Sequence, residues 1–423
     1  MAVNTDPALQ NAVIYSVYVR AHTPEGSFRA LTEDLERIRA LGTDILWLMP
    51  IHPIGVVGKK GSLGCPYAIR DYRGLKPAYG SMEDFRALAD AVHGLGMKLM
   101  IDVVYNHTSP DSVLYGEHPE YFYHGSDGKP GNKIGDWADV IDLDYSVPEL
   151  WDYQIETLCR WAEIVDGFRC DVASFLPLGF WEQARAAVER VRPGCIWLAE
   201  SVHASFGNLA RSLGFTAVRD TELYAAFDME YEYDIRTAFE RMLRDELPLS
   251  AWTELLELQE ALYPAGYNKL RFLENHDQPR IAALLPEEDI RDSFTAMLFF
   301  LKGSTLLYAG QEFSAVHTPS LFEKETVDRS GRDISPLLRR LAEIKRSLGP
   351  DDAFFASADD EKKIAVLERV NGEGRKLGVF PLGGRGGAVK VTLPDGTYKN
   401  RLDNETVVVK DGKLNCTGAV IIC

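Results

Sequence analysis

The sequence predicts an α/β protein: a (β/α)8 TIM barrel with a short insertion after the third strand and a small C-terminal all-β domain. Three observations lead to this fold class. Apolar stretches alternate with amphipathic ones over roughly the first 350 residues, a long segment without helical period interrupts them once, and short strands separated by turns fill the end of the chain.

Eight stretches are the expected barrel strands. They are rich in apolar, β-branched or aromatic residues, and continuous runs such as DILWLMP are typical of strands buried on both faces. Eight strands that alternate with helices indicate a TIM barrel. A doubly wound open sheet is the alternative, but no glycine-rich phosphate-binding turn follows the first strand. The expected strands are residues 13–19, 44–50, 97–104, 167–171, 195–200, 225–230, 268–275 and 304–310.

Amphipathic stretches between the strands supply the helices. Residues 27–41 place their leucines and isoleucine on one helical stripe, and a glycine follows as a stop signal. Capping boxes, in which a serine and an acidic residue three positions later satisfy each other's backbone amides, predict two further helix starts. These boxes pair Ser81 with Asp84 and Ser146 with Glu149.

Two segments depart from the alternation. Residues 108–144 are rich in aromatic residues, Gly, Asp and His and have no helical period, and a loop of that length in a compact domain is usually functional. After about residue 350, short strands are separated by Asn-Gly, Gly-Gly and Asp-Gly turns, which predicts a small β-sandwich. We therefore divide the chain into the barrel, in two parts at 1–107 and 145–349, the insertion 108–144 and the C-terminal domain 350–423.

The composition indicates a globular chain and excludes two classes of partner. The chain is 46% hydrophobic and 26% charged, and its formal net charge is −17. An acidic surface repels phosphate backbones and anionic lipids, so we expect no nucleic-acid and no membrane partner. No stretch resembles a secretory signal or reaches the roughly 20 apolar residues of a membrane span. The six cysteines show no spacing typical of a metal site or a disulfide framework, so a cytoplasmic protein is expected.

The stretch GFRCDVAS places an arginine two residues before an aspartate. In a strand, Arg169 and Asp171 point to the same face, and a guanidinium beside a carboxylate favours its ionised form and fixes its direction. Such a pair suits a nucleophile. A structural ion pair on the sheet is the alternative interpretation, and the other strand ends decide between the two.

Chemically capable side chains gather at the carboxyl ends of the expected strands, where barrel enzymes keep their sites. Asp171 and Glu200 are one strand–helix–strand step apart, so they are expected to project from adjacent strands into a common mouth. The side chains at these strand ends are Asp102, Asn106, His107, Arg169, Asp171, Glu200, Asn275, His276 and Asp277.

Paired carboxylates without a metal or nucleotide motif suggest the cleavage of a glycosidic bond. Arg169 is expected to keep Asp171 charged so that it attacks the substrate. Glu200 follows the apolar run CIWLA, a setting that raises the pKa of a carboxyl group and keeps it protonated as the acid.

Four of these segments carry a resemblance to a known family. DVVYNH, GFRCDVAS, the glutamate that ends IWLAE, and FLENHD are similar, in this order, to the four conserved regions of the α-amylase family, glycoside hydrolase family 13. The resemblance covers roughly residues 13–349. In this family the insertion after the third strand, here residues 108–144, is called domain B. It implies a retaining mechanism on α-glucosidic bonds.

The resemblance also implies roles for seven residues. The catalytic residues would be Asp171 as nucleophile, Glu200 as acid and base, and Asp277 as the carboxylate that stabilises the transition state. Four further residues would bind the sugar that precedes the scissile bond, with the first of them stacking on its ring: Tyr67, His107, Arg169 and His276.

Two positions depart from the family pattern. Many α-amylases carry Lys-His where this chain has Ser174 and Phe175, and those residues contact the leaving-group side and help the calcium site. Asn106 with Asp136 or Asp139 offers oxygen ligands for a structural calcium ion, but the changed positions argue against one, and no metal site is assigned. No cofactor is expected for the chemistry.

The leading functional hypothesis is a retaining hydrolase of α-1,4-glucosidic bonds in starch-type glucans or maltodextrins, acting through a covalent glucosyl-Asp intermediate. A transglycosylase or a glucosyl isomerase on the same scaffold is the alternative, because both use the same carboxylates. A non-catalytic glucan-binding homologue is a further alternative, and the presence of all three carboxylates disfavours it.

Overall fold

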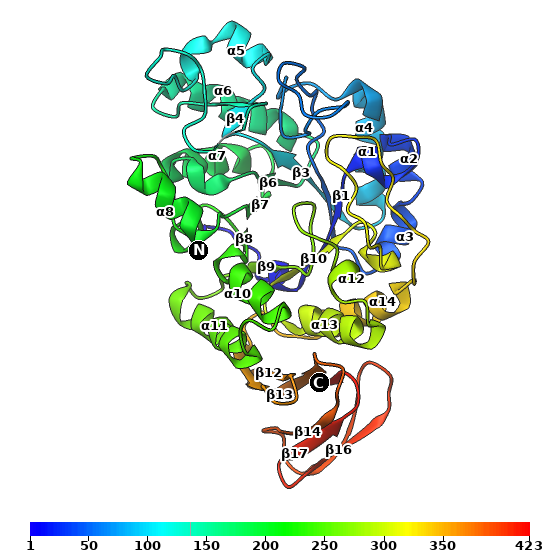
Figure 1. The fold of residues 1–423 in the computed structure, drawn as a ribbon. Helices are drawn as coiled ribbons and strands as arrows, with labels where there is room; N and C mark the ends of the chain where they lie inside the picture. Colours follow the sequence, from blue (N-terminus) through cyan, green and yellow to red (C-terminus); the bar gives the residue numbers. More distant parts are fainter. Residues whose placement is uncertain (136) are drawn as a thin grey trace.

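A computed structural model describes residues 1–135 and 137–423 of the chain (Figure 1). Within these residues, eight parallel strands close into a barrel in the order β1-β10-β9-β8-β7-β6-β3-β2, with helices around it. The predicted TIM barrel is therefore confirmed. Its strands are β1 (Val13–Val17), β2 (Ile45–Leu48), β3 (Lys98–Val103), β6 (Gly167–Cys170), β7 (Ile196–Ala199), β8 (Met229–Tyr231), β9 (Lys269–Arg271) and β10 (Ser304–Tyr308).

The sixth barrel strand, β8, lies later than predicted. The stretch expected at 225–230 overlaps β8 only at its end, because residues 225–227 close turns after a short helix, with their amides bonded to carbonyls three or four residues back. Asp228, directly before β8, binds the neighbouring strand β7 through its side chain. Its Oδ2 accepts a hydrogen bond from the Trp197 amide at 2.8 Å, and Arg185 lies 2.7 Å from its Oδ1.

The helices follow the predicted amphipathic stretches with two changes. The helix expected at 27–41 is split into α2 and α3, and the capping box at Ser146 is wrong: α6 begins at Pro148, whose missing amide suits a first turn. The Ser81–Asp84 box does cap α4. The helices are α1 (Val19–His22), α2 (Phe28–Thr32), α3 (Leu35–Ala40), α4 (Met82–Gly94), α5 (Val113–Glu117), α6 (Pro148–Ala162), α7 (Leu178–Glu189), α8 (Ala204–Ser212), α9 (Asp220–Leu223), α10 (Tyr233–Leu243), α11 (Leu249–Leu262), α12 (Ile281–Leu284), α13 (Glu288–Phe300) and α14 (Ser335–Arg346).

The barrel strands are buried on both faces, as their continuous apolar runs predict. In β1 and β2 every residue is buried, with alternate side chains on opposite faces of the sheet. One face packs inside the barrel around Trp47, Met100 and Tyr231, and the other packs against the helices. This core fixes the strand ends from which the candidate site projects.

Domain B extends from the end of β3 and contains α5, a 3₁₀ turn at Pro119–Tyr121, and a two-stranded sheet of β4 (His107–Thr108) and β5 (Ile141–Asp142). Figure 1 shows it at the end of the molecule opposite the C-terminal domain. The β4–β5 pairing puts His107 opposite Asp142 and so ties both ends of the insertion together at the barrel.

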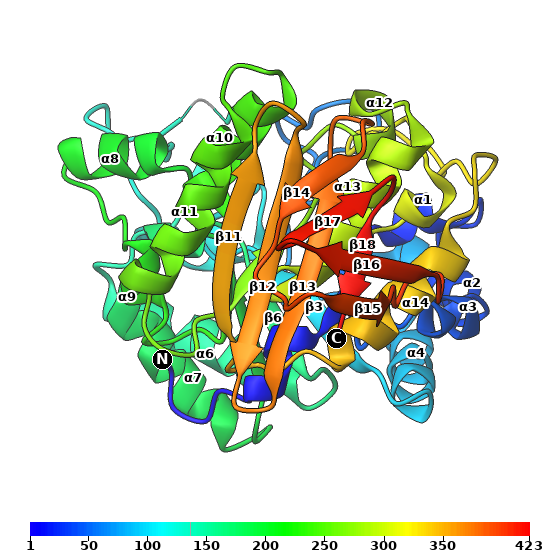
Figure 2. The ribbon, with the colours of Figure 1, turned by 90° about the horizontal axis from the view of Figure 1, so that it is seen from below.

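The C-terminal domain packs two four-stranded sheets on each other within residues 353–422, all of which the structure describes (Figure 2). One sheet consists of β11 (Ala353–Asp359), β12 (Ile364–Asn371), β13 (Gly374–Pro381) and β18 (Val420–Ile422). The other consists of β14 (Gly387–Lys390), β17 (Lys413–Cys416), β16 (Thr406–Lys410) and β15 (Gly396–Lys399). Residues such as Val379 and Leu414 fill the space between the sheets, which makes this domain the predicted sandwich. The domain boundaries themselves stay predictions.

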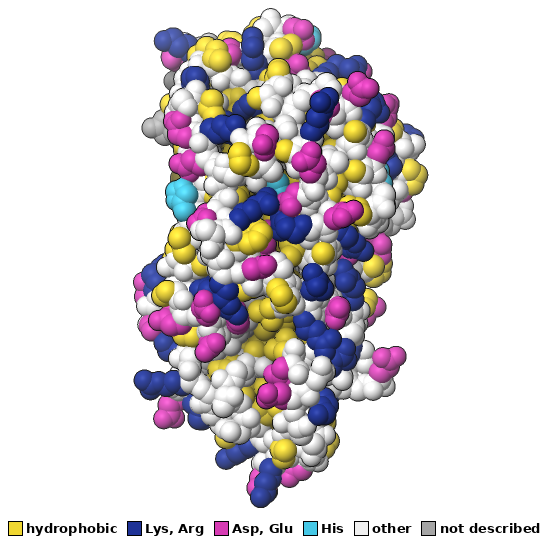
Figure 3. Space-filling model, turned by 90° about the vertical axis from the view of Figure 1, so that its right-hand side faces the viewer, with side chains coloured by type: hydrophobic (Ala, Val, Ile, Leu, Met, Phe, Trp, Pro, Cys, Tyr) yellow, Lys and Arg dark blue, Asp and Glu magenta, His cyan; other side chains and the backbone are white. Residues whose placement is uncertain are grey.

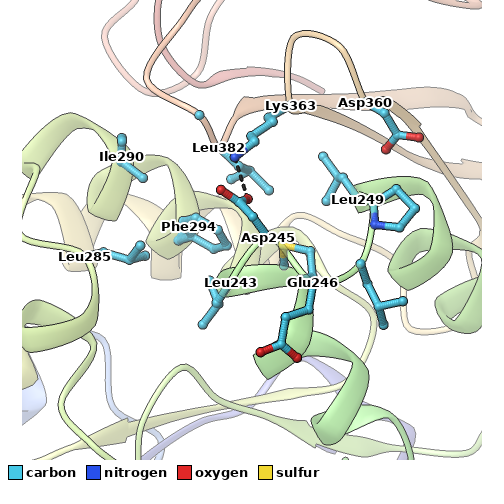
Figure 4. Close-up of a pocket in the computed structure, with 14 residues that line it drawn as sticks. Leu243, Asp245, Glu246, Leu249, Leu285, Ile290, Phe294, Asp360, Lys363 and Leu382 are labelled. Atoms are coloured by element: carbon cyan, nitrogen blue, oxygen red, sulfur yellow. Dashed lines mark hydrogen bonds and ion pairs between the residues drawn. The ribbon is translucent and has the colours of Figure 1, made fainter.

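The C-terminal domain is held against the barrel by apolar and ionic contacts. The rings of Phe300 and Phe380 lie 5.9 Å apart across the junction. A pocket of about 630 Å³ lies between the end of α10, the start of α13 and the turns next to β12 and β13 (Figure 4). Lys363 Nζ lies 2.5 Å from Asp245 Oδ1 at this pocket, so the ion pair joins the two domains.

The surface carries charges of both signs. Figure 3 shows acidic and basic side chains interspersed over one side of the molecule. Among the helices that the structure describes, none combines the length and the apolar character needed to cross a membrane.

Candidate active site

The guanidinium of Arg169 is the centre of a buried charge cluster at the carboxyl ends of the strands. Arg169 lies in β6 beside Asp102 of β3, its register partner, and both are fully buried. Its Nη1 donates to Asp102 Oδ1 at 2.9 Å and to Asp171 Oδ1 at 2.9 Å. The predicted same-face arrangement of Arg169 and Asp171 is therefore present, and Asp102 joins the pair.

Glu200 completes this cluster from the end of β7. Its Oε1 lies 2.6 Å from Arg169 Nη2, an ion pair whose alignment is too poor for a hydrogen bond. Its Oε2 accepts the backbone amide of Val172 at 2.8 Å. Val172 has a φ of 37°, which is strained for a β-branched residue, and strain of this kind concentrates at functional sites.

Burial raises the pKa of each carboxyl group in the cluster. The pKa of Asp171 rises to about 7 and that of Glu200 to about 8, because desolvation outweighs the opposing charge of Arg169. Arg169 lowers both pKa values, as the sequence predicts, but it is shared by three carboxylates and does not by itself keep Asp171 fully ionised. The well-aligned hydrogen bond goes to Asp171, so the proton favours Glu200.

Tyr67 and His276 form the next layer around the cluster. Tyr67 Oη donates to Asp102 Oδ2 at 3.1 Å and lies 2.7 Å from His276 Nε2. The two rings are stacked with centroids 5.5 Å apart. Burial lowers the pKa of His276 to about 4, so the imidazole is neutral at pH 7 and suits hydrogen bonding to sugar hydroxyls.

Asp277 contacts His276, and His107 lies beside Tyr67. The Asp277 side chain is 43% exposed, and its Oδ2 lies 3.2 Å from His276 Nε2. Its charge raises the pKa of both Asp171 and Glu200, so it lies within electrostatic range of them. His107 is buried beside the backbone of Tyr67, and burial lowers its pKa. The structure thus gathers all seven predicted residues at one mouth of the barrel, while their catalytic roles stay predictions.

Comparison with known families shows which family the chain belongs to. The family described as "Alpha amylase, catalytic domain" matches residues 5–140 and 135–335, and the one described as "Bacterial Alpha amylase C-terminal domain" matches residues 355–423. The chain belongs to the α-amylase family. This confirms the resemblance carried by the four strand-end motifs.

Individual members of the α-amylase family resemble the whole chain or part of it. An alpha-amylase from Lactobacillus plantarum is 46% identical, with a TM-score of 0.95 over 99% of both chains. A noncanonic maltogenic alpha-amylase from Thermotoga neapolitana is 33% identical, with a TM-score of 0.87 over 98% of this chain and 99% of that one. The alpha-amylase MalA of Haloarcula japonica is 26% identical over 72% of this chain, which spans only 44% of that protein.

The sequence of this α-amylase family chain did not predict that Trp47 and Tyr231 surround Arg169. The guanidinium carbon lies 5.3 Å from the ring centroid of Trp47 and 5.5 Å from that of Tyr231, so both rings face the cation. Near Glu200, the rings of Tyr233 and His203 lie 4.8 Å apart. The available signal was the inward position of Trp47 in its strand, but inward aromatic residues usually only fill a barrel core.

Phe175, one of the two positions that depart from the family pattern, belongs to an apolar cluster. Phe175 packs against Phe206 with ring centroids 5.1 Å apart, and Trp137 packs on Phe206 at 6.0 Å. Ser174 is fully buried and its carbonyl accepts the Val218 amide at 2.8 Å.

One of the candidate calcium ligands already has a cationic partner within the protein. Asp139 is paired with Lys60, whose Nζ lies 2.8 Å from its Oδ1, so a cation of the protein already neutralises this carboxylate. Asp136 lies outside the described residues. Among the residues that are described, no group of three Asp, Glu, His or Cys side chains is arranged to hold a metal ion. That the chemistry needs no cofactor stays a prediction.

The raised pKa of Glu200 predicts a pH-dependent gain in stability for Glu200→Gln. The pKa of Glu200 in the folded state lies above its pKa in the unfolded state. The contribution of Glu200 to the stability of the wild type is therefore fully present below about pH 4.5 and is lost as pH rises through about 8. Glutamine lacks this loss. The variant should gain about 2–4 kcal/mol over the wild type between pH 5 and pH 9.

Denaturant unfolding at both pH values measures this gain. Glu182→Gln, an exposed change of the same type on α7, is the matched control and should show no pH-dependent difference from the wild type. An equal effect of Glu200→Gln at both pH values would contradict the assignment of a raised pKa.

Proposed function

We propose that the chain is a retaining hydrolase of α-1,4-glucosidic bonds in starch-type glucans or maltodextrins. The observation that carries this proposal is the single guanidinium of Arg169, which contacts both Asp171 and Glu200. A shared guanidinium favours the short carboxyl separation of about 5–5.5 Å that retaining enzymes need, rather than the wider gap that admits a water in inverting enzymes.

In the proposed mechanism, Asp171 attacks the anomeric carbon while Glu200 donates its proton to the leaving oxygen. The glycosidic bond breaks and a covalent glucosyl-Asp171 ester forms. Glu200, now ionised, takes a proton from water, and the resulting hydroxide equivalent attacks the anomeric carbon and releases Asp171. The hydrogen bond from Arg169 to Asp171 supports this division of work, because it favours the ionised form of the group that must attack.

The surrounding residues are proposed to hold the sugar at the reacting carbon. The Tyr67 ring supplies a flat apolar face for stacking, and the neutral His107 and His276 offer hydrogen bonds to its hydroxyls. Asp277 is the most exposed of the three carboxylates, which suits a group that binds sugar hydroxyls from solvent. The two similar structures described above, from Lactobacillus plantarum and Thermotoga neapolitana, are both named alpha-amylases, which supports an α-glucan as the substrate.

Products formed from maltoheptaose test this proposal. Proton NMR of the first minutes of reaction should show shorter maltooligosaccharides whose new reducing ends appear as the α-anomer before mutarotation. A β-anomer would mean inversion and would reject the roles of Asp171 and Glu200. Chains longer than the substrate would show transfer instead of hydrolysis, and trehalose or an isomaltose-type sugar would show isomerisation.

A further inference from the structure

The loop that carries Tyr67 contains a glycine at every third position from Gly55 to Gly64, in the sequence GVVGKKGSLG. The two ends of the loop lie side by side, since Ile54 pairs with Ile69 and the Gly55 amide donates to the Ala68 carbonyl at 2.9 Å. Compact surface loops of this kind are frequently functional. We call residues 55–64 the glycine strap.

One side of the glycine strap is fastened to domain B. The backbone amides of Val56 and Val57 donate to Asp111 Oδ1 at 3.1 and 3.3 Å. Lys60 Nζ lies 2.8 Å from Asp139 Oδ1, on a carboxylate that is almost fully buried. These contacts hold the strap against the insertion that follows β3.

The other side of the glycine strap is fastened to the loop after β10. The Leu63 amide donates to the Phe322 carbonyl at 3.0 Å, and the Ser62 amide donates to Glu323 Oε1 at 2.8 Å. That loop is in turn joined to the segment that carries His276 and Asp277, because Arg280 Nε donates to the His317 carbonyl at 3.2 Å.

The contacts of the strap with domain B and with the loop after β10 require glycine at positions 58 and 61. A Cβ at Gly58 would come within 2.7 Å of the Ala138 carbonyl oxygen in domain B, and a Cβ at Gly61 would come within 2.6 Å of Phe322 and Glu323. Both glycines also have positive φ, at 69° and 63°. The sequence therefore encodes a strap that touches both neighbours with its backbone.

The strap turns three separate loops into one wall. In the barrel order, this wall covers the arc from β3 through β2 and β1 to β10, on the side of Tyr67. Glu200 follows β7 on the opposite arc, and an acid that protonates the leaving oxygen lies on the side where the leaving group departs. The wall therefore stands at the other end of the bound sugar, where the rest of the non-reducing side of a glucan chain would have to lie.

We propose that the glycine strap closes the non-reducing side of the site, so that the enzyme attacks chain ends and releases one short product. This inference rests on the proposed hydrolysis of α-1,4 bonds and specifies which bond of the chain is cut. The chain end would enter the walled side, and the remainder of the glucan would extend past Glu200 on the opposite side of the site.

Maltoheptaose with its terminal non-reducing glucose blocked as the 4,6-ethylidene derivative tests the proposal. The wild type should release one short saccharide from free maltoheptaose and cleave the blocked one at least about 100-fold more slowly, because the blocked end clashes with the wall. Equal rates on both substrates would overturn the inference. Failure to cleave either substrate would instead overturn the proposed hydrolysis.

Unfastening the strap supplies a second test. Lys60→Ala with Glu323→Ala removes one attachment on each side and should raise the blocked-to-free rate ratio about tenfold. The matched control is Lys390→Ala with Glu83→Ala, which changes the same residue types at exposed positions on the C-terminal domain and on α4, and its ratio should equal that of the wild type. A folded double variant with an unchanged ratio would show that the strap is not the barrier. If that variant does not fold, the wild-type ratio still decides.

Discussion

Asp171→Asn is expected to lower kcat on maltodextrins about 10⁴-fold or more while leaving the fold intact. An amide is a poor nucleophile, and no other side chain in the cluster is placed to replace it, because Asp102 is fully buried behind Arg169. Asparagine has nearly the same shape as aspartate and still accepts the hydrogen bond from Arg169 Nη1. The loss should therefore appear in the chemical step rather than in binding or folding.

Substrates that differ in their leaving group separate Asp171 from Glu200. A maltosyl fluoride needs no protonation to leave, so Glu200→Gln should form the covalent intermediate from it at a rate closer to the wild type's than from maltoheptaose. Asp171→Asn should remain inactive on both. Mass spectrometry of quenched reactions detects the maltosyl ester that the fluoride forms on Asp171, and Asp152→Asn, an exposed change on α6, serves as control. Near-normal turnover of Asp171→Asn on either substrate would reject its role as nucleophile.

The barrel was predictable because its strands are buried on both faces and therefore carry apolar runs that stand out from the amphipathic helices. The exception is β8, which has three residues and is preceded by turns whose alanines and phenylalanine resemble a strand. The start of α6 was also misplaced. The N-cap of α6 is Val147, directly before Pro148, so Ser146 lies one residue too early to cap the helix.

The convergence of the seven site residues followed from topology alone, since parallel strands bring their carboxyl ends to one rim. Their electrostatics did not follow from topology, because the sequence shows that Arg169 neighbours Asp171 but not that it also contacts Asp102 and Glu200. The glycine strap went unrecognised for a similar reason. Its regular glycines were visible, but their meaning depends on contacts with two loops far away in the sequence.

Removal of the Arg169 guanidinium should have the largest effect on stability. Arg169→Met leaves three buried carboxyl groups without their cation, and breaking a buried ion pair from one side costs about 3–5 kcal/mol. Without the guanidinium the folded-state pKa values of these groups rise further above their unfolded values. Stability is then present at low pH, where the groups are protonated, and is lost as pH rises, so the variant should be far less stable at pH 8 than at pH 5.

Arg169→Lys distinguishes charge from geometry in the same cluster. Lysine keeps the positive charge, so the variant should recover most of the stability at pH 8, but a single ammonium lacks the planar fork that contacts Asp171 and Glu200 together. Its kcat should therefore stay low. Urea unfolding at both pH values gives the stabilities, and Arg86→Met, at an exposed position on α4, is the control. If Arg169→Met lost the same free energy at pH 5 and pH 8, the carboxylates would not depend on Arg169 for their charge, and the proposed division of work between Asp171 and Glu200 would lose its physical basis.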